Sequence, residues 1–230
     1  MSLFVPARRP SLELLDQPGL SSEEMARSLE DLELVNRVWG NARVLEEHLA
    51  ASLTERGDSR WTILDLGAGS GGVARELAGR LGRRGARVLV VAVDTQWRHL
   101  AAGRGRGHGV VAVAADAFAL PFAAASADWL VSTLFFHHFS PEENVRLLAE
   151  MTRVARRGFA LLDIRRHLFP LLAVSIAGRI AFKSPVSVSD GIASVRQAYT
   201  AEEAVRIAAR AGPGVVVETV FPFRILVHRR

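Results

Sequence analysis

The sequence predicts an α/β protein with a Rossmann-like, seven-stranded, mostly parallel sheet, helices on both faces and an antiparallel C-terminal strand pair. Apolar, β-branched runs alternate with helical patterns through the middle of the chain, which is typical of right-handed β-α-β units. The run 87–94 is apolar almost throughout, as expected of a strand buried on both faces. Near the C-terminus, only Phe221 and Pro222 separate two such runs, a link too short for a parallel crossover.

Composition limits the class of protein. The chain has 230 residues, 49% hydrophobic and 23% charged, which is ordinary for a globular protein with a sizeable core. It has no cysteine, which excludes disulfides, thiolate nucleophiles and cysteine metal sites. The formal net charge is +5, but arginines such as Arg27 and Arg43 lie among acids, as on solvated helix faces. We therefore expect no nucleic-acid partner, and a cytoplasmic protein without a signal segment.

The N-terminal region is expected to be helical. Ser21 and Ser22 precede two acids and then apolar residues at helical spacing, which indicates the start of a helix. Gly40 interrupts this pattern, and 41–53 continues as a second helix. We expect the chain to be organised as follows: 1–56, an N-terminal helical cap; 57–230, a Rossmann-like domain with a helical insertion at about 167–200.

The alternation that begins at residue 61 sets the order of the remaining elements. Strands are expected at 63–66, 87–94, 110–114, 128–133, 158–164, 215–220 and 223–227. Helices are expected between them at 73–81, 96–102 and 141–156. Ser140 is the expected N-cap of the helix at 141–156.

The segment 167–182 is strongly apolar. It is shorter than the roughly 20 residues that span a bilayer, and it contains Pro170 and Arg179, so no transmembrane segment is expected. A pocket wall or a plain core helix is the favoured interpretation, with a dimer face and a membrane-surface contact left open. The expected oligomeric state is a monomer or a homodimer.

A glycine turn follows the first strand of the predicted sheet. The chain reads Asp65-Leu66-Gly67-Ala68-Gly69-Ser70-Gly71-Gly72, and glycines let the backbone approach a ligand closely. At the carboxyl edge of a parallel sheet, such a turn forms a nucleotide-type site. Gly67, Gly69 and Gly72 also fit the dinucleotide fingerprint G-x-G-x-x-G, with Asp94 lying 94 − 72 = 22 positions further on.

Three acids at strand ends distinguish a dinucleotide site from a site for S-adenosylmethionine. Asp65 would face a pyrophosphate across the turn, where two anions repel each other, whereas S-adenosylmethionine has no phosphate and carries an ammonium and a sulfonium. Asp65, Asp94 and Asp116 each end or follow a predicted strand, so they converge at one sheet edge. An NAD(P)-dependent oxidoreductase would use Asp94 alone, and it is kept as the alternative.

On these motifs, the stretch 61–164 resembles the class I S-adenosylmethionine-dependent methyltransferases. The stretch 64–71 is similar to their first motif, Asp94 to the acid that takes the ribose hydroxyls, and Asp116 to the acid that meets the adenine amino group. The resemblance implies S-adenosyl-L-methionine as the cofactor. The residues it implies for cofactor binding are Asp65, Gly67, Ala68, Gly69, Gly71, Asp94, Thr95, Asp116, Ala117 and Thr133.

The wider chain resembles bacterial small-molecule methyltransferases that act on quinols, phenols or polyketides, through the stretches 163–166 and 194–200. After the fourth strand, the chain has Leu134-Phe135-Phe136-His137 in place of Asn/Asp-Pro-Pro-Tyr/Phe, which disfavours methylation of base or amide nitrogens. The resemblance implies secondary metabolism and methyl transfer to a hydroxyl oxygen or activated carbon of a small, largely apolar acceptor. A non-catalytic S-adenosylmethionine-binding partner protein is a further alternative.

His137 and His138 follow the fourth strand, where the resemblance places the methyl group. A histidine can take the proton of a phenol or enol, and His137 is the preferred general base, although the pair equally suits a loop-ordering role. No third metal ligand of suitable spacing is visible, so no metal is expected. Arg165 and Tyr199 are candidate substrate residues, with a solvated charge and a packed aromatic ring as the alternatives.

Overall fold

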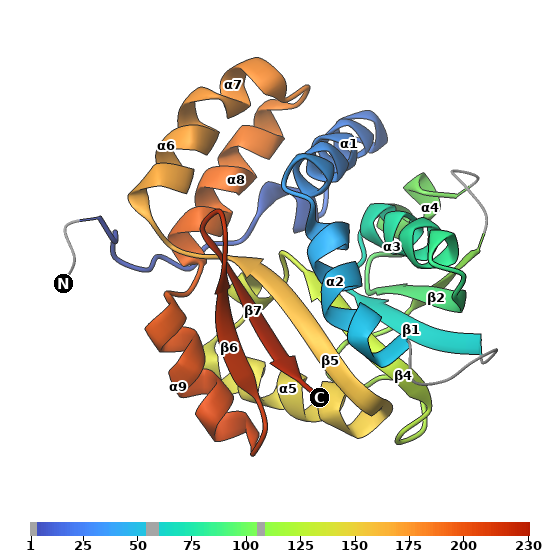
Figure 1. Ribbon diagram of the computed structural model, residues 1–230. Helices are drawn as coiled ribbons and strands as arrows, with labels where there is room; N and C mark the ends of the chain where they lie inside the picture. The colour runs from blue at the N-terminus through green and yellow to red at the C-terminus, as the bar shows by residue number, and fades with distance from the viewer. Residues whose placement is uncertain (1–3, 54–59, 105–108) are drawn as a thin grey trace.

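The computed structural model describes residues 4–53, 60–104 and 109–230, so the expected boundary between 56 and 57 lies outside the described residues. The sheet has seven strands in the order β3-β2-β1-β4-β5-β7-β6 (Figure 1). Strands β1 to β5 pair in parallel, and β7 pairs antiparallel with β5 and β6. The predicted fold class is therefore confirmed.

The strands lie within three residues of their predicted bounds. They are β1 Arg60–Leu66, β2 Arg87–Asp94, β3 Val110–Ala114, β4 Ala127–Thr133, β5 Ala155–Ile164, β6 Val216–Val220 and β7 Arg224–Arg229. The 3₁₀ turns are η1 Leu14–Asp16 and η2 Phe136–His138. The helices are α1 Ser22–Val38, α2 Asn41–Leu53, α3 Gly72–Arg83, α4 Trp97–Ala102, α5 Pro141–Val154, α6 Leu168–Ile176, α7 Gly178–Ala181, α8 Pro185–Gln197 and α9 Ala201–Ala211.

Helix caps account for two of the helix starts that the sequence indicates. The Ser21 side chain accepts a hydrogen bond from the backbone N–H of Glu24 at the start of α1. Ser140 and Glu143 form a reciprocal capping box at the start of α5, as the sequence predicted for Ser140. These local bonds satisfy N–H groups that have no partner within the helix.

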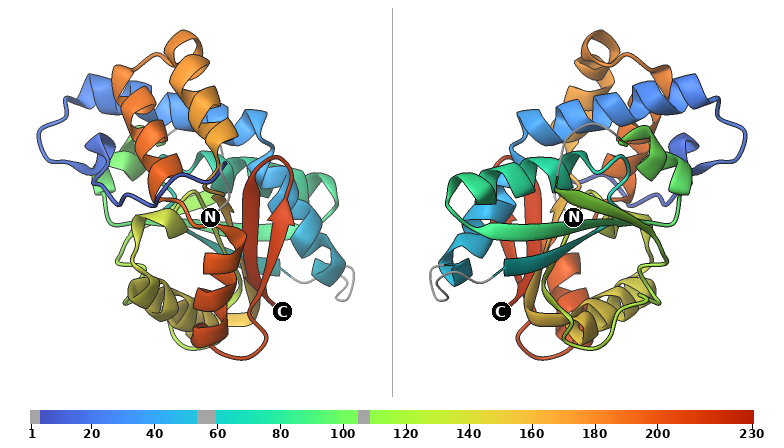
Figure 2. Two further views of the ribbon diagram at one scale, coloured as in Figure 1. Left: turned by 90° about the vertical axis from the view of Figure 1, so that its left-hand side faces the viewer. Right: turned by 90° about the vertical axis from the view of Figure 1, so that its right-hand side faces the viewer.

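Two helical layers cover the sheet, as Figure 2 shows. On one face, α5 and α9 bury Leu147 and Ile207 against Leu130 and its neighbours. On the other face, α2, α3 and α4 form a second core, in which Leu45 and Leu77 pack with the strands. Helix α2 therefore packs on the sheet, while α1 crosses above it (Figure 1).

A third group of helices, α1 and α6 to α8, lies above the carboxyl edge of the parallel strands (Figure 1). The N-terminal segment crosses beneath α8 and is fixed to it. Asp190 of α8 accepts hydrogen bonds from Leu14 N–H at 2.7 Å and Leu15 N–H at 2.9 Å, and Arg9 N–H donates to the Arg196 carbonyl. Among the described residues, no helix is both long and apolar enough to cross a membrane.

Candidate active site

A cavity of about 600 Å³ lies between the carboxyl edge of the sheet and the helices above it. The turns after β1, β2, β3 and β4 all reach it, as the convergence argument predicted. Nine predicted site residues line it: Gly67, Gly69, Asp94, Thr95, Asp116, Ala117, Thr133, His137 and His138. Most of the remaining wall is apolar and comes from α1, α6, α7 and α8.

The glycine turn adopts backbone angles that require glycine. Gly67 has φ +65°, Gly69 has φ +54°, and Gly71 has φ +75° at the N-cap of α3. A Cβ on Gly67 would also lie 2.4 Å from the Phe135 ring. Gly67 and Gly69 therefore present backbone to the cavity, while Gly71 and Ala68 shape the turn behind it.

Asp94 ties this turn to the end of β2. Its Oδ2 accepts from Gly69 N–H and its Oδ1 from Gln96 N–H, both at 2.8 Å. Burial raises the pKa of Asp94 above its ordinary value, and these two hydrogen bonds oppose the rise. Each carboxylate oxygen keeps a lone pair for a further donor.

Asp65 lies beneath the turn and does not line the cavity. Its carboxyl group is fully buried, and its Oδ2 has no hydrogen-bond partner among the described residues. Burial, together with the nearby charge of Asp94, raises the pKa of Asp65 to about 7. Ionisation of the Asp65 carboxyl group therefore lowers the stability of the folded protein.

Asp65→Asn is expected to flatten the pH dependence of stability. The folded pKa of about 7 exceeds the ordinary value of 3.8, so stability that is present below pH 3.8 is lost as the pH rises through 7. The loss is about 4 kcal/mol, from roughly three pKa units. Urea unfolding of the cofactor-free protein at about pH 5 and about pH 8 measures the part of this loss that falls between those two pH values, about 2.6 kcal/mol. An equal pH slope in the wild type and the variant would contradict the assignment.

A polar clamp joins α1 to the glycine turn. The Ser70 hydroxyl donates to Glu33 Oε1 at 2.5 Å, and Arg75 forms an ion pair with the same oxygen at 2.7 Å. Arg75 also donates to the Ser70 carbonyl at 2.6 Å. A Cβ on Gly72 would lie 2.6 Å from the Glu33 side chain, so this glycine gives the clamp its space.

The third predicted acid marks the turn after β3. Asp116 Oδ1 accepts from Phe118 N–H at 2.9 Å, which leaves its other oxygen without a partner in this turn. The Phe118 ring packs edge-on against Phe139 at 4.9 Å, next to the segment after β4. Asp116 and Asp94 thus lie at two points of one cavity wall.

His137 is buried between two carboxylates. Its Nδ1 lies 2.7 Å from Asp163 Oδ1 on β5, and its Nε2 lies 3.4 Å from Glu13 Oε1. Its backbone N–H donates to Asp163 Oδ2 at 2.8 Å. Burial by itself lowers the pKa of His137, but the charge and hydrogen bond of Asp163, with Glu13, outweigh it and raise the pKa to about 10. His137 is therefore an imidazolium at neutral pH.

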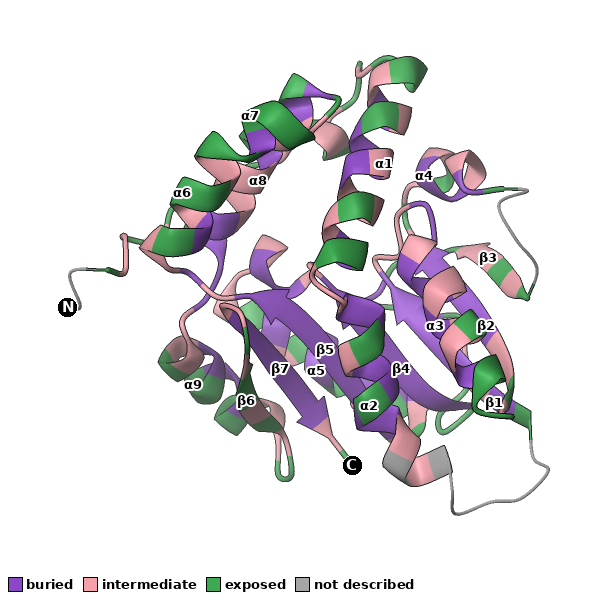
Figure 3. Ribbon diagram, turned by 45° about the horizontal axis from the view of Figure 1, so that its top comes forward, coloured by how far each residue is buried: buried purple, intermediate pink, exposed green. Residues whose placement is uncertain are grey.

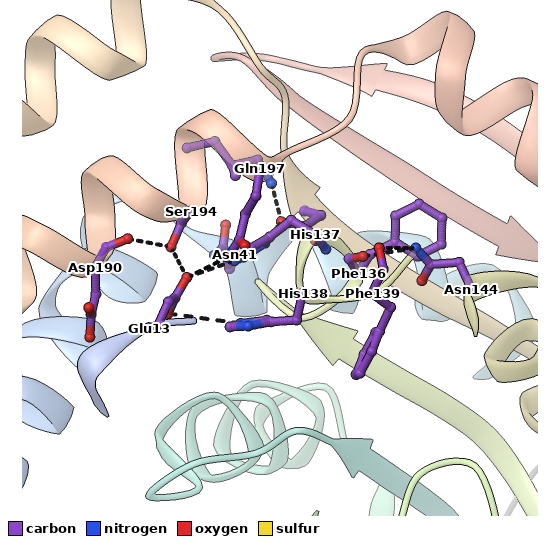
Figure 4. A network of polar contacts seen from close by, with 12 residues as sticks. Glu13, Asn41, Phe136, His137, His138, Phe139, Asn144, Asp190, Ser194 and Gln197 are labelled. Atoms are coloured by element: carbon purple, nitrogen blue, oxygen red, sulfur yellow. Dashed lines mark hydrogen bonds and ion pairs between the residues drawn. The ribbon is translucent and has the colours of Figure 1, made fainter. Parts of the chain in front are cut away.

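Glu13 comes from the N-terminal segment and completes the cluster in Figure 4. Its Oε1 accepts from the Ser194 hydroxyl at 2.6 Å and from Gln197 Nε2 at 2.9 Å. Burial opposes its ionisation, but the bond with His137 and the charges of both histidines lower the pKa of Glu13 to about 2. Glu13 is therefore ionised beside the imidazolium of His137.

His138 differs from His137 in its surroundings. The two rings stack with centroids 4.3 Å apart, and His138 Nε2 lies 3.9 Å from Glu13 Oε2. Burial and the positive charge of His137 lower the pKa of His138 below its ordinary value, against the opposing charges of Glu13 and Asp16. This shift favours the neutral form of His138, although the sequence analysis preferred His137 as the base.

Glu13, His137 and His138 have ligand-type atoms within 4.8 Å of one another. The sequence revealed no third ligand because Glu13 lies more than 120 residues before the histidines. In this structure the imidazolium and the carboxylate neutralise each other. The expectation that the protein needs no metal stays a prediction.

Arg165 and Tyr199 lie outside the residues that line the cavity. The Tyr199 hydroxyl donates to the Phe139 carbonyl at 2.6 Å, and its ring packs on Phe136. The Arg165 guanidinium lies 5.7 Å from the centroid of the Phe223 ring. Both side chains thus have partners of their own, and neither lines the cavity.

The sequence analysis assigned no role to Glu13, Glu33 or Asp163. Asp163 ends the fifth strand, so the strand-end rule that found Asp94 signals it as well. Glu13 lies in a short irregular segment, and Glu33 looks like an ordinary polar residue of an amphipathic helix. Only long-range packing brings these two glutamates to the site.

Comparisons with known proteins agree with this architecture. Residues 64–162 match the family model of a methyltransferase domain, and no curated protein matches the chain. A SAM-dependent methyltransferase from Aquifex aeolicus superposes with TM-score 0.61 at 18% identity, covering 91% of this chain and 98% of that one.

Two larger proteins have the same fold. The CMeT domain structure of the citrinin polyketide synthase gives TM-score 0.60 at 18% identity, over 82% of this chain and 51% of that one. Human N-acetylserotonin methyltransferase, solved with SAM, gives TM-score 0.63 at 15% identity, over 91% of this chain and 56% of that one. This chain therefore spans about half the length of each of them.

Proposed function

We propose that this chain, which carries an S-adenosylmethionine-dependent methyltransferase domain over residues 64–162, methylates a hydroxyl oxygen or an activated carbon of a small, largely apolar acceptor. The cavity is the observation that carries the proposal. It joins the glycine turn and its acids to the Glu13–His137–His138 cluster, and its other walls are mainly apolar. Cofactor and acceptor can thus meet in one enclosed space.

The chain's donor and acceptor groups fit the cofactor. Gly67 and Gly69 offer close backbone approach, and Asp94 and Asp116 have free lone pairs for ribose hydroxyls and an adenine amino group. Asp65 lies beneath the turn with a pKa of about 7, and a cationic ligand above it would favour its ionised form. When bound, S-adenosyl-L-methionine supplies an electrophilic methyl group on its sulfonium.

The acceptor end of the cavity has one polar cluster in an apolar wall. Helices α1 and α6 to α8 contribute side chains such as Leu32, Val35 and Val174. An acceptor with an apolar body and one ionisable oxygen or carbon fits this distribution. The names of two structural neighbours, N-acetylserotonin methyltransferase and a polyketide synthase CMeT domain, support a small-molecule acceptor.

His138 is the proton acceptor in this proposal. It lines the cavity, and its lowered pKa keeps an imidazole nitrogen free to take the proton of a phenol or enol. The imidazolium of His137, fixed by Asp163 and Glu13, stacks on His138 and, with burial, keeps the pKa of His138 low. The proton thus moves to His138 while His137 keeps its own.

Ligand-dependent melting tests the choice of cofactor. S-adenosylhomocysteine at about one hundred times its Kd is expected to stabilise the protein by about 2.7 kcal/mol, or roughly 5–10 °C in Tm. NAD⁺ and NADP⁺ are expected to leave Tm unchanged, because neither matches the three acids. A rise with NAD(P) alone would favour an oxidoreductase.

A second measurement tests catalysis. Radiolabelled S-adenosylmethionine is incubated with a panel of phenols, quinols and polyketide-like enols, and we expect methyl transfer to at least one class. Cofactor binding without transfer to any acceptor would instead favour a non-catalytic S-adenosylmethionine-binding partner.

A further inference from the structure

Helices α6 and α7 are apolar on two opposite sides. One side lines the cavity through residues such as Pro170, Val174 and Gly178. The other side is exposed, as the outward-facing parts of both helices in Figure 3 illustrate. We define the outer apolar face by four residues with their exposed fractions: Phe169 59%, Leu172 46%, Ile176 64% and Ile180 86%.

Aromatic rings extend this face at the start of α6. Phe169 stacks on Phe223 with centroids 5.7 Å apart, and His167 lies between Phe4 and Phe223 at 6.2 and 4.7 Å. Phe221, in the turn between β6 and β7, is 89% exposed. The exposed apolar surface thus continues from two helices onto a neighbouring turn.

An apolar outer side is unusual for a peripheral helix. Helix α9 shows the ordinary pattern, since Ala204 and Ile207 face the core while Glu202 and Arg210 are exposed. A helix that is apolar all round is normally buried, and contiguous exposed apolar surface marks a contact site. The outer face of α6 and α7 therefore needs an apolar partner.

The charges around the face indicate an anionic partner. No Asp or Glu occurs in the stretch 164–189, which contains Arg165, Arg166, Arg179 and Lys183. Arg166 pairs with Glu203 and Lys183 with Glu30. Arg179 lies next to Ile180 on α7, is exposed and forms no salt bridge within the described residues.

We propose that the outer apolar face rests on an anionic lipid surface, from which a lipid-dissolved acceptor enters the cavity between these helices. Interfacial helices bind by inserting apolar side chains while basic residues meet anionic headgroups, and this face has both. Since α6 and α7 also form the cavity wall, the path from lipid to cavity crosses only one layer of helix. The entry of the acceptor rests on the proposed function, whereas the lipid contact does not.

A second copy of the chain fits this face less well. A two-fold dimer would place the exposed Arg179, which forms no salt bridge within the described residues, on both sides of the interface. Arg179 would then approach a positively charged surface without an opposing carboxylate from this stretch. Lipid phosphates supply a negative charge opposite Arg179.

Vesicle flotation with the full chain tests the lipid contact. We expect the protein to float with vesicles of phosphatidylcholine and phosphatidylglycerol, and to bind phosphatidylcholine alone more weakly. The double variant Ile176→Glu, Ile180→Glu is expected to lower the partition coefficient at least about tenfold. Val205→Glu is the matched control, because Val205 is also half exposed but lies on α9.

Two outcomes would overturn the lipid contact. One is vesicle binding that the double variant and the control retain equally. The other is a dimer in sedimentation velocity that dissociates in the double variant, without vesicle binding by the wild type. The rise in Tm with S-adenosylhomocysteine, measured on the same variants, separates failure of the lipid contact from failure of the cofactor site.

Discussion

Replacement of His138 by glutamine is expected to lower turnover by about 10²- to 10⁴-fold, the usual contribution of a positioned general base. Glutamine retains polarity and approximate size but cannot take a proton at neutral pH. Affinity for S-adenosylhomocysteine should stay within a factor of about two, because the groups proposed to bind the cofactor lie on other turns of the cavity. The measurement is turnover with an acceptor from the panel, beside calorimetry of S-adenosylhomocysteine binding.

The pH profile separates a base from a packing residue. Burial and the charge of His137 lower the pKa of His138, so activity should rise with pH on the acid side of neutrality and reach a plateau near neutrality. His137→Gln removes a neighbouring positive charge, so it should move this rise to higher pH. NMR titration of the imidazoles should show His137 protonated until about pH 10.

His228→Gln provides the matched control. His228 bonds to Glu218 at 3.2 Å and lies outside the cavity wall, so its replacement should leave the profile unchanged. Full activity of His138→Gln would contradict the assignment of His138 as the base. A pH–activity profile of that variant with an unchanged rise on the acid side would contradict it as well.

Asp94→Asn is expected to raise the Kd for S-adenosylhomocysteine about 100-fold, which corresponds to loss of about 2.7 kcal/mol from charged hydrogen bonds. The amide also turns an N–H₂ group toward either Gly69 N–H or Gln96 N–H, where the carboxylate accepts from both. The variant therefore disturbs the glycine turn as well as the ribose contact. Calorimetry measures the Kd directly.

Asp128→Asn is the control for Asp94. Asp128 also accepts from a backbone N–H, that of Thr62 at 3.0 Å, but it lies at the opposite end of the strands and pairs with Arg156. Its replacement should change Tm but leave the Kd for S-adenosylhomocysteine unchanged. An unchanged Kd in Asp94→Asn would contradict the ribose assignment.

The fold was largely predictable because its signals are local. Buried parallel strands carry apolar runs such as 87–94, and turns carry glycine or capping residues such as Ser140. The prediction for the segment 167–182 was less specific, because its composition fitted a core helix, a pocket wall or a surface contact. The structure divides it into α6 and α7, with one apolar side on the cavity and one exposed.

The position of the acids on one wall of the cavity was predictable to nearly the same extent. Asp94 and Asp116 end or follow consecutive strands, and parallel pairing places such positions at one edge of the sheet. The same reasoning placed Asp65 near the ligand, but burial beneath the turn and a raised pKa are properties of packing. Arg165 and Tyr199 were candidate substrate residues with a solvated charge and a packed ring as the alternatives, and neither lines the cavity.

The sequence by itself determined the order of strands and helices, the glycine turn and the set of acids along one sheet edge. The reason is that hydrophobic periodicity, turn-forming residues and the positions of strand ends all depend on residues that are close together in the chain. Tertiary structure decided the chemistry of the two histidines. Glu13 reaches them across more than 120 residues and Asp163 from β5, and together they raise the pKa of His137. Burial and the positive charge of His137 then lower the pKa of His138. A pKa depends on charges and burial in space, which residue spacing alone does not specify.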